Sequence, residues 1–115
     1  MTAEPAARVV LVTTPDATVA EQLVRTLLDE GIIACGSIVP GLDSIYRWQG
    51  QVERSAEVLL ILKTTAAEVA RLVARVPELH PYDVPEVLVL PVLAGHPPYL
   101  QWLGESVGRD VAEGE

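Results

Sequence analysis

The sequence predicts an α+β sandwich in which two helices cover one face of an antiparallel sheet, with a further helix at the C-terminus. Three observations favour this class. Apolar residues recur at helical spacing around 20–28 and 69–76, a long extended stretch lies between these segments, and short apolar runs flank them. The resulting order, β-α-β-β-α-β plus a terminal helix, is typical of the ferredoxin-like fold.

The chain length fits one domain over residues 1–115, because 115 residues form one hydrophobic core and are too few for two. We expect the folded core to span 8–107. Residues 1–6 and 108–115 are predicted to be polar tails.

The first half begins with the run "RVVLVTT" at 8–14, which predicts a strand. A helix over 16–30 follows, opened by Thr14 as the capping residue and by Pro15 in its first turn. Gly31 is a suitable terminator. One apolar stripe predicts that a single helix face packs on the sheet: Ala20, Leu23, Val24, Leu27 and Leu28.

Residues 32–63 are expected to be extended almost throughout, with an interruption at Pro40-Gly41 and a tight reversal at Gln49-Gly50. This is one long central hairpin. Its second strand is apolar on both faces near the end, so we expect that part of the strand to be covered on both sides.

The length of the hairpin predicts that it does not fit within the body of the domain as a straight ribbon. A strand of about 13 residues is about 43 Å long, whereas a 115-residue domain has a radius of gyration near 13 Å and a diameter of about 35 Å. The hairpin must therefore bend or protrude. Tyr46 and Trp48 share one face near its tip, and a neighbouring copy of the chain is the simplest cover for them. The alternative is a bulge at Pro40-Gly41 that folds the arm back over its own sheet in a monomer.

In the second half, Thr65-Ala66-Ala67-Glu68 has the form of a capping box that opens a helix, which Pro77 stops or kinks. A strand is expected near 86–93, with Pro91 placing it at a sheet edge or a bulge. Pro97 and Pro98 then start a shorter helix.

Composition excludes several classes of function. A formal charge of −8, from 16 acidic and 8 basic residues, argues against a nucleic-acid-binding surface. Cys35 is the only cysteine, the N-terminus lacks a signal-like segment, and no apolar run has membrane-spanning length, so we expect a cytoplasmic protein with no membrane partner. Phosphate-binding loops and nucleophile motifs are absent, so we expect no enzyme.

The stretch "LHPYDVPE" at 79–86 is the main candidate for a site, because it places His80 beside Tyr82, Asp83 and Glu86. Imidazole, carboxylate and a thiolate such as that of Cys35 are ligands for copper or zinc. The competing interpretation is a stiff turn, since prolines bracket the segment and lead into a strand. Cys35, likewise, is either a ligand or a small core residue.

Two further charged residues, Glu57 and Lys63, lie on the same face of the apolar strand, six residues and about 20 Å apart. They are too far apart to pair with each other. Each therefore has either a structural partner on another strand or a role in contacting a ligand.

Several segments together resemble the CutA divalent-cation-tolerance proteins: "VTTPD", "ACGSIVPGLDSIYRWQG", "EVLLILKTT", "LHPYDVPEVLVLPV" and "YLQWL". The resemblance spans 8–107. It implies a ferredoxin-like homotrimer in the cytoplasm, in which long hairpins pair with neighbouring copies. It also implies a link to tolerance of copper and other divalent metals.

Carried over by position, the resemblance implies a ligand cleft and a metal site. The cleft residues that the resemblance implies are Tyr46, Trp48, Glu57, Lys63, Tyr82, His80 and Glu86, with Cys35 in its usual place. We expect any metal site to centre on His80, with Glu86, Asp83 and Cys35 as the further candidates. Val12 and Arg75 stand where some members have further cysteines, which disfavours a thiolate-rich copper site. Two rival functions remain: a trimeric sensor of a small anionic metabolite, similar to PII proteins, and a structural assembly hub.

Overall fold

The computed structural model describes residues 6–108 and contains four strands and three helices. The elements are β1 (Ala7–Thr14), α1 (Ala17–Asp29), β2 (Cys35–Trp48), β3 (Gln51–Thr65), a short 3₁₀ turn η1 (Ala66–Glu68), α2 (Val69–Leu79), β4 (Leu88–Pro91) and α3 (Pro97–Glu105). Their order is the predicted β-α-β-β-α-β plus a helix. The predicted polar tails lie outside the described residues, apart from residues 6 and 108.

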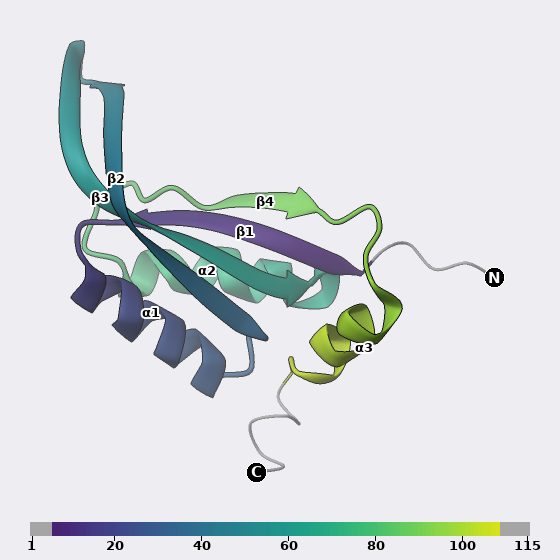
Figure 1. The fold of residues 1–115 in the computed structure, drawn as a ribbon. Coiled ribbons are helices and arrows are strands. Elements are labelled where there is room, and N and C mark those ends of the chain that lie inside the picture. The colour runs from purple at the N-terminus through teal and green to yellow at the C-terminus, as the bar shows by residue number, and fades with distance from the viewer. Residues whose placement is uncertain (1–5, 109–115) are drawn as a thin grey trace.

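One antiparallel sheet holds all four strands in the order β2-β3-β1-β4, and α1 and α2 lie side by side against one of its faces (Figure 1). This arrangement confirms the ferredoxin-like fold. The main core lies between the sheet and these helices. It is built from alternate residues of β1 and β3 and from the helix stripes: Val10, Val12, Leu60, Leu62, Leu23, Leu27, Leu72 and Val76.

The opposite face of the sheet carries the other alternate residues. Cross-strand register places these side chains on it: Leu88, Leu90, Val9, Leu11, Leu59, Ile61, Lys63, Cys35 and Val39. We call this surface the open face. α3 packs over one end of it, where Ala7 and Leu103 are buried together. The rest has no helix over it (Figure 1), so among residues 6–108 the expected two-sided cover of β3 is met only at the end that α3 contacts.

The hairpin of β2 and β3 continues past the sheet as a free arm (Figure 1). A register shift between Val39 and Leu42 marks a bulge at the predicted interruption, and Gly41 has φ 82° there. The molecule measures 50 × 29 × 23 Å, with a radius of gyration of 15.1 Å. The protrusion is therefore confirmed, and the alternative in which the arm folds back over its own sheet is wrong.

The tip of the arm is the predicted tight turn. Gln49 and Gly50 have φ of 51° and 81°, the left-handed pair that suits the twist of a two-residue hairpin loop. Apolar side chains along the arm remain exposed, including Ile45 at 63% and Val52 at 66%. A single chain therefore leaves the arm without apolar cover.

Both predicted helix caps are corrected by the structure. Asp16, and not Thr14, caps α1 by accepting a hydrogen bond from the Val19 amide at 2.8 Å. Thr14 is fully buried at the end of β1, and its hydroxyl donates to the Asp16 carbonyl. The predicted capping box is wrong in the same way, because buried Thr65 makes no capping hydrogen bond and the carboxylate of Glu68 pairs with Arg71.

In the second half of the chain, the observed boundaries of the helices and strands also differ from the predicted ones. α2 passes through Pro77 and ends at Leu79, so of the two predicted effects of this proline, stopping the helix is wrong, and the kink stays a prediction. β4 is shorter than the predicted 86–93, but it lies at the sheet edge as Pro91 indicated. α3 begins at Pro97, as expected. Within the described residues, no helix combines the length and the hydropathy needed to cross a bilayer.

Candidate functional site

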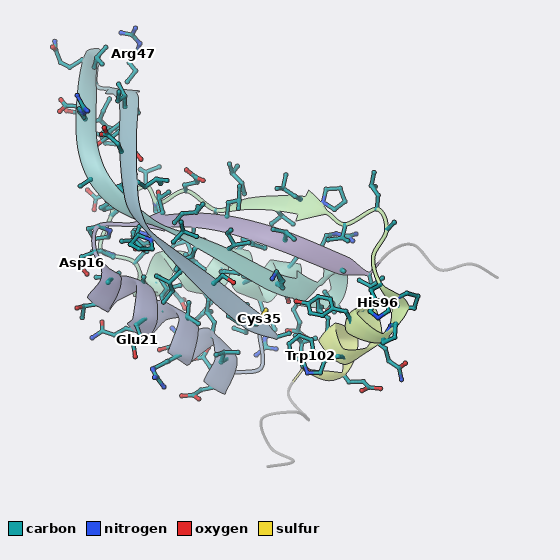
Figure 2. All side chains as sticks on the ribbon, viewed as in Figure 1. Asp16, Glu21, Cys35, Arg47, His96 and Trp102 are labelled. Carbon is teal, nitrogen blue, oxygen red and sulfur yellow. The ribbon has the colours of Figure 1, made fainter. Side chains whose placement is uncertain are left out.

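The predicted site residues fall into two groups at opposite ends of the sheet. Glu57, His80 and Tyr82 meet at the base of the arm, beside the start of α1. Cys35 and Lys63 lie opposite each other in the β2–β3 ladder, near α3. Figure 2 shows the separation, with Asp16 toward the arm and with Cys35 and Trp102 toward α3.

At the base of the arm, Glu57 and Tyr82 form a direct hydrogen bond. The Tyr82 hydroxyl donates to Oε2 of Glu57 at 2.7 Å, and Glu57 is only 9% exposed. Burial, followed by the hydrogen bond and the negative charge of Glu57, raises the pKa of Tyr82 well above its usual range. The phenol therefore stays protonated and serves as the donor that satisfies a buried carboxylate.

His80 is buried beside this pair and uses both ring nitrogens. The Tyr82 amide donates to Nδ1 at 3.1 Å, and Nε2 lies 2.8 Å from the Thr13 carbonyl oxygen. An amide can only donate, so Nδ1 accepts, and Nε2 carries the proton that is donated to Thr13. Neither nitrogen is free for a metal in this arrangement, which supports the stiff-turn interpretation of 79–86.

The extended backbone of His80 completes this turn. Its φ and ψ are −91° and 139°, the region that a following proline imposes on the residue before it. Asp83 and Glu86 follow on the turn with exposed side chains. The local sequence thus ends α2, fixes His80 and leaves two carboxylates facing solvent.

The predicted metal candidates do not converge within one chain. Cys35 lies at the far end of the sheet from His80, Asp83 and Glu86. Across residues 6–108, no three His, Cys, Asp or Glu side chains form a group that could hold a metal ion. Residues 6–108 of a single chain therefore do not supply a three-ligand site.

The arm carries the remaining predicted cleft residues, Tyr46 and Trp48, which are 42% and 45% exposed. The Tyr46 hydroxyl lies 2.9 Å from the Ser55 hydroxyl on the paired strand. Nearby, Arg54 hydrogen-bonds both oxygens of Asp43 and holds the pKa of that carboxyl below its ordinary value. These cross-strand bonds keep the arm paired beyond the sheet.

Near α3 the structure adds two aromatic residues that were not assigned to the site. The Lys63 ammonium lies 5.9 Å from the centre of the Tyr99 ring, and Cys35 Sγ lies 3.8 Å from the Tyr99 hydroxyl oxygen. The Tyr99 and Trp102 rings are 5.4 Å apart. The segment "YLQWL" places these aromatics three residues apart on one helix face, but only the packing of α3 shows what they face.

Known proteins resemble this chain in sequence and in fold. The family model described as CutA1 divalent ion tolerance protein matches residues 8–106. The chain belongs to this family. The resemblance inferred from the sequence segments is thereby confirmed.

Individual relatives agree over nearly the whole chain. The divalent-cation tolerance protein CutA of Thermus thermophilus is 49% identical over 100 residues, covering 87% of this chain and 97% of its own. Its solved structure superposes with a TM-score of 0.86 at 48% identity, covering 89% of this chain and 99% of its own. CutA1 from Oryza sativa gives 0.87 at 40% identity, covering 91% and 96%. The CutA1 family member described here thus shares its fold with proteins named for divalent-cation tolerance.

Proposed function

We propose that the protein acts in cytoplasmic tolerance of divalent metal ions, copper among them, as a non-enzymatic homotrimer that binds the cation in clefts between its copies. The observation that carries this proposal is the apolar open face, together with the projecting arm. The names of its relatives support a role in divalent-cation tolerance in general.

The exposed apolar surface supports assembly. Leu88 and Leu90 on the open face are 55% and 45% exposed, and apolar side chains of the arm are exposed as well. A sheet face and a sheet edge with this character favour association. An arm that reaches from one copy onto the sheet of the next makes a head-to-tail contact, and such contacts close only as a ring. The family resemblance implies that this ring has three copies.

The proposed cation site then lies between copies. Asp83 and Glu86 are exposed on the turn and can contribute carboxylate oxygens from one chain. His80 joins them only if it gives up its hydrogen bond to Thr13 or to Tyr82. Cys35, at the other end of the sheet, reaches such a site only from another copy. The remaining ligands must come from a neighbour.

Calorimetric titration with copper(II) tests the cation site. We expect the D83N/E86Q double variant to lose about tenfold or more in affinity, since two carboxylates are neutralised without a change in size. H80A reports whether the imidazole takes part. H96A is the matched control, because His96 precedes α3 at the other end of the sheet. Unchanged affinity in both D83N/E86Q and H80A would remove the turn from the site.

Sedimentation tests the assembly separately. We expect Leu88→Asp, which places a charge on the open face, to dissociate the oligomer while the chain stays folded. Leu28→Asp is the control, because Leu28 is 40% exposed on the outer helix layer. A wild-type protein that sediments at 12.4 kDa at micromolar concentration would overturn the homotrimer.

A second candidate function, binding of a small anion, is favoured by one observation. Lys63 lies among aromatic and apolar side chains of the open face, and no carboxylate of residues 6–108 pairs with it. A cation in such surroundings is a natural anion site.

A further inference from the structure

Lys63 is the only cation among the open-face residues. It pairs in register with Val9 on one side and with Cys35 on the other, and Leu90 lies beyond Val9. Arg8 pairs in register with Thr64, so its side chain projects from the other face. In the part of the chain from residue 6 to 108, no carboxylate lies within ion-pair distance of Lys63.

Tyr99 lies beside this ammonium, and it is itself in contact with Cys35 and Trp102. The Tyr99 ring centre is 5.9 Å from Nζ, and the Tyr99 hydroxyl oxygen is 3.8 Å from Sγ of Cys35. Trp102 tilts by 39° against Tyr99, and the two residues are 43% and 40% exposed. The group thus combines one positive charge, a hydroxyl, a thiol and a solvent-accessible aromatic pair.

The chemistry of this group selects a class of ligand. One ammonium balances one negative charge, whereas a phosphate with two charges is usually held by several cationic or amide donors. A hydroxyl and a thiol add weaker donors on the same side. The half-exposed rings offer an apolar surface for a flat group, which aromatic side chains contact in offset or tilted geometry.

We propose that Lys63, Tyr99 and Cys35 bind the carboxylate of a small planar aromatic acid whose ring rests against Tyr99 and Trp102. The carboxylate accepts hydrogen bonds from the ammonium, the phenol and the thiol. The site lies about six strand residues, or about 20 Å, from the Glu57–Tyr82 pair. Apart from Cys35, which the proposed cation site can draw from another copy, it shares no residue with that site.

Calorimetric titration of the full-length protein with benzoate tests the proposal, with neutral benzamide as the matched ligand control. We expect saturable binding of benzoate and none of benzamide. Lys63→Met should weaken benzoate binding by about tenfold or more, and Tyr99→Phe by a smaller factor. Arg25→Met is the control variant: it removes one positive charge from the exposed outer face of α1 and should bind as wild type does.

Two results would overturn the proposal. One is equal affinity for benzoate in wild type and Lys63→Met. The other is the absence of benzoate binding to wild type. If Lys63→Met then also loses assembly, the partner of Lys63 is a carboxylate of a neighbouring copy. Circular dichroism of each variant confirms that it is folded. The copper titration uses the D83N/E86Q and H80A variants, which change no residue of the anion site, so the two titrations test the two sites separately.

Discussion

Tyr82→Phe is the sharpest test of the buried polar pair at the base of the arm. The substitution keeps the ring and removes the hydroxyl that donates to Glu57 at 2.7 Å. A hydrogen bond to a charged acceptor contributes about 1.5–3 kcal/mol. Tyr82 is only partly buried, so water can replace part of the lost bond. We therefore expect a loss of about 1.5–2 kcal/mol in the free energy of unfolding.

Urea denaturation at a fixed protomer concentration measures this loss, since the stability of an oligomer depends on concentration. Glu57→Gln and the double variant complete a mutant cycle, in which we expect a coupling energy of about 1–2 kcal/mol. Tyr46→Phe is the control, because its hydroxyl contacts Ser55 on the exposed arm, and we expect a change under about 0.5 kcal/mol. A cost for Tyr82→Phe as small as that of the control, with no coupling, would refute the reasoning.

The same pair predicts a dependence on alkaline pH. The pKa of Tyr82 is raised in the folded state, first by burial and then by Glu57, so the folded chain retains a proton that the unfolded chain loses near pH 10. Stability from this group is therefore complete below about pH 10 and falls as pH rises toward the folded-state pKa. Tyr82→Phe should lack this component of the fall, which denaturation at several alkaline pH values measures.

Three further predictions concern stability and use the same denaturation assay. Gly36→Ala should cost about 1–3 kcal/mol of stability, because the new Cβ would lie 2.9 Å from a side-chain carbon of Val24. Gly104→Ala is the matched substitution at a position with open space around it, and it should stabilise α3 by up to about 1 kcal/mol. Glu30→Gln should cost about 0.5–1 kcal/mol of stability at pH 7, because it removes the ion pair with Arg75. Arg75 lowers the pKa of Glu30, so this stabilisation is present above pH 4.5 and disappears as pH falls through the folded-state pKa. A difference between wild type and variant that persists at pH 2 would contradict the prediction. Gln49→Asn should stabilise the arm by a few tenths of a kcal/mol, because asparagine tolerates the left-handed backbone at this turn better than glutamine does, and a loss of stability would count against the turn assignment.

Some of these substitutions should change only the stability of the chain, whereas others should change its assembly or ligand binding. The substitutions at Gly36 and Glu30 act on the contacts of a single chain and should leave the oligomer and any ligand site unchanged. Leu88→Asp and Lys63→Met act on the open face, where assembly and anion binding are proposed. Comparing both sets separates defects of folding from defects of function.

Local patterns in the sequence determined the order of elements, the long hairpin, its turn and its bulge. Helical stripes and strand alternation arise from the 3.6- and 2-residue repeats of the backbone, which each segment carries by itself. The Gln49-Gly50 turn and the interruption at Pro40-Gly41 follow from backbone preferences that are equally local. Strand length alone predicted that the hairpin must bend or protrude, since the strand is longer than the body that would have to contain it, and the structure decided for the protruding arm.

Contacts between distant segments decided the rest. Thr14 could not act as a cap because the sheet and the helices bury it, a fact that its neighbours in sequence do not contain. The occupation of both His80 nitrogens depends on the Thr13 carbonyl, 67 residues away, and the contact between Cys35 and Tyr99 joins residues 64 apart. The spacing of residues along the chain does not predict such long-range contacts. The packing of the sheet brings these atoms together, and it divides the predicted site residues between two ends of the molecule.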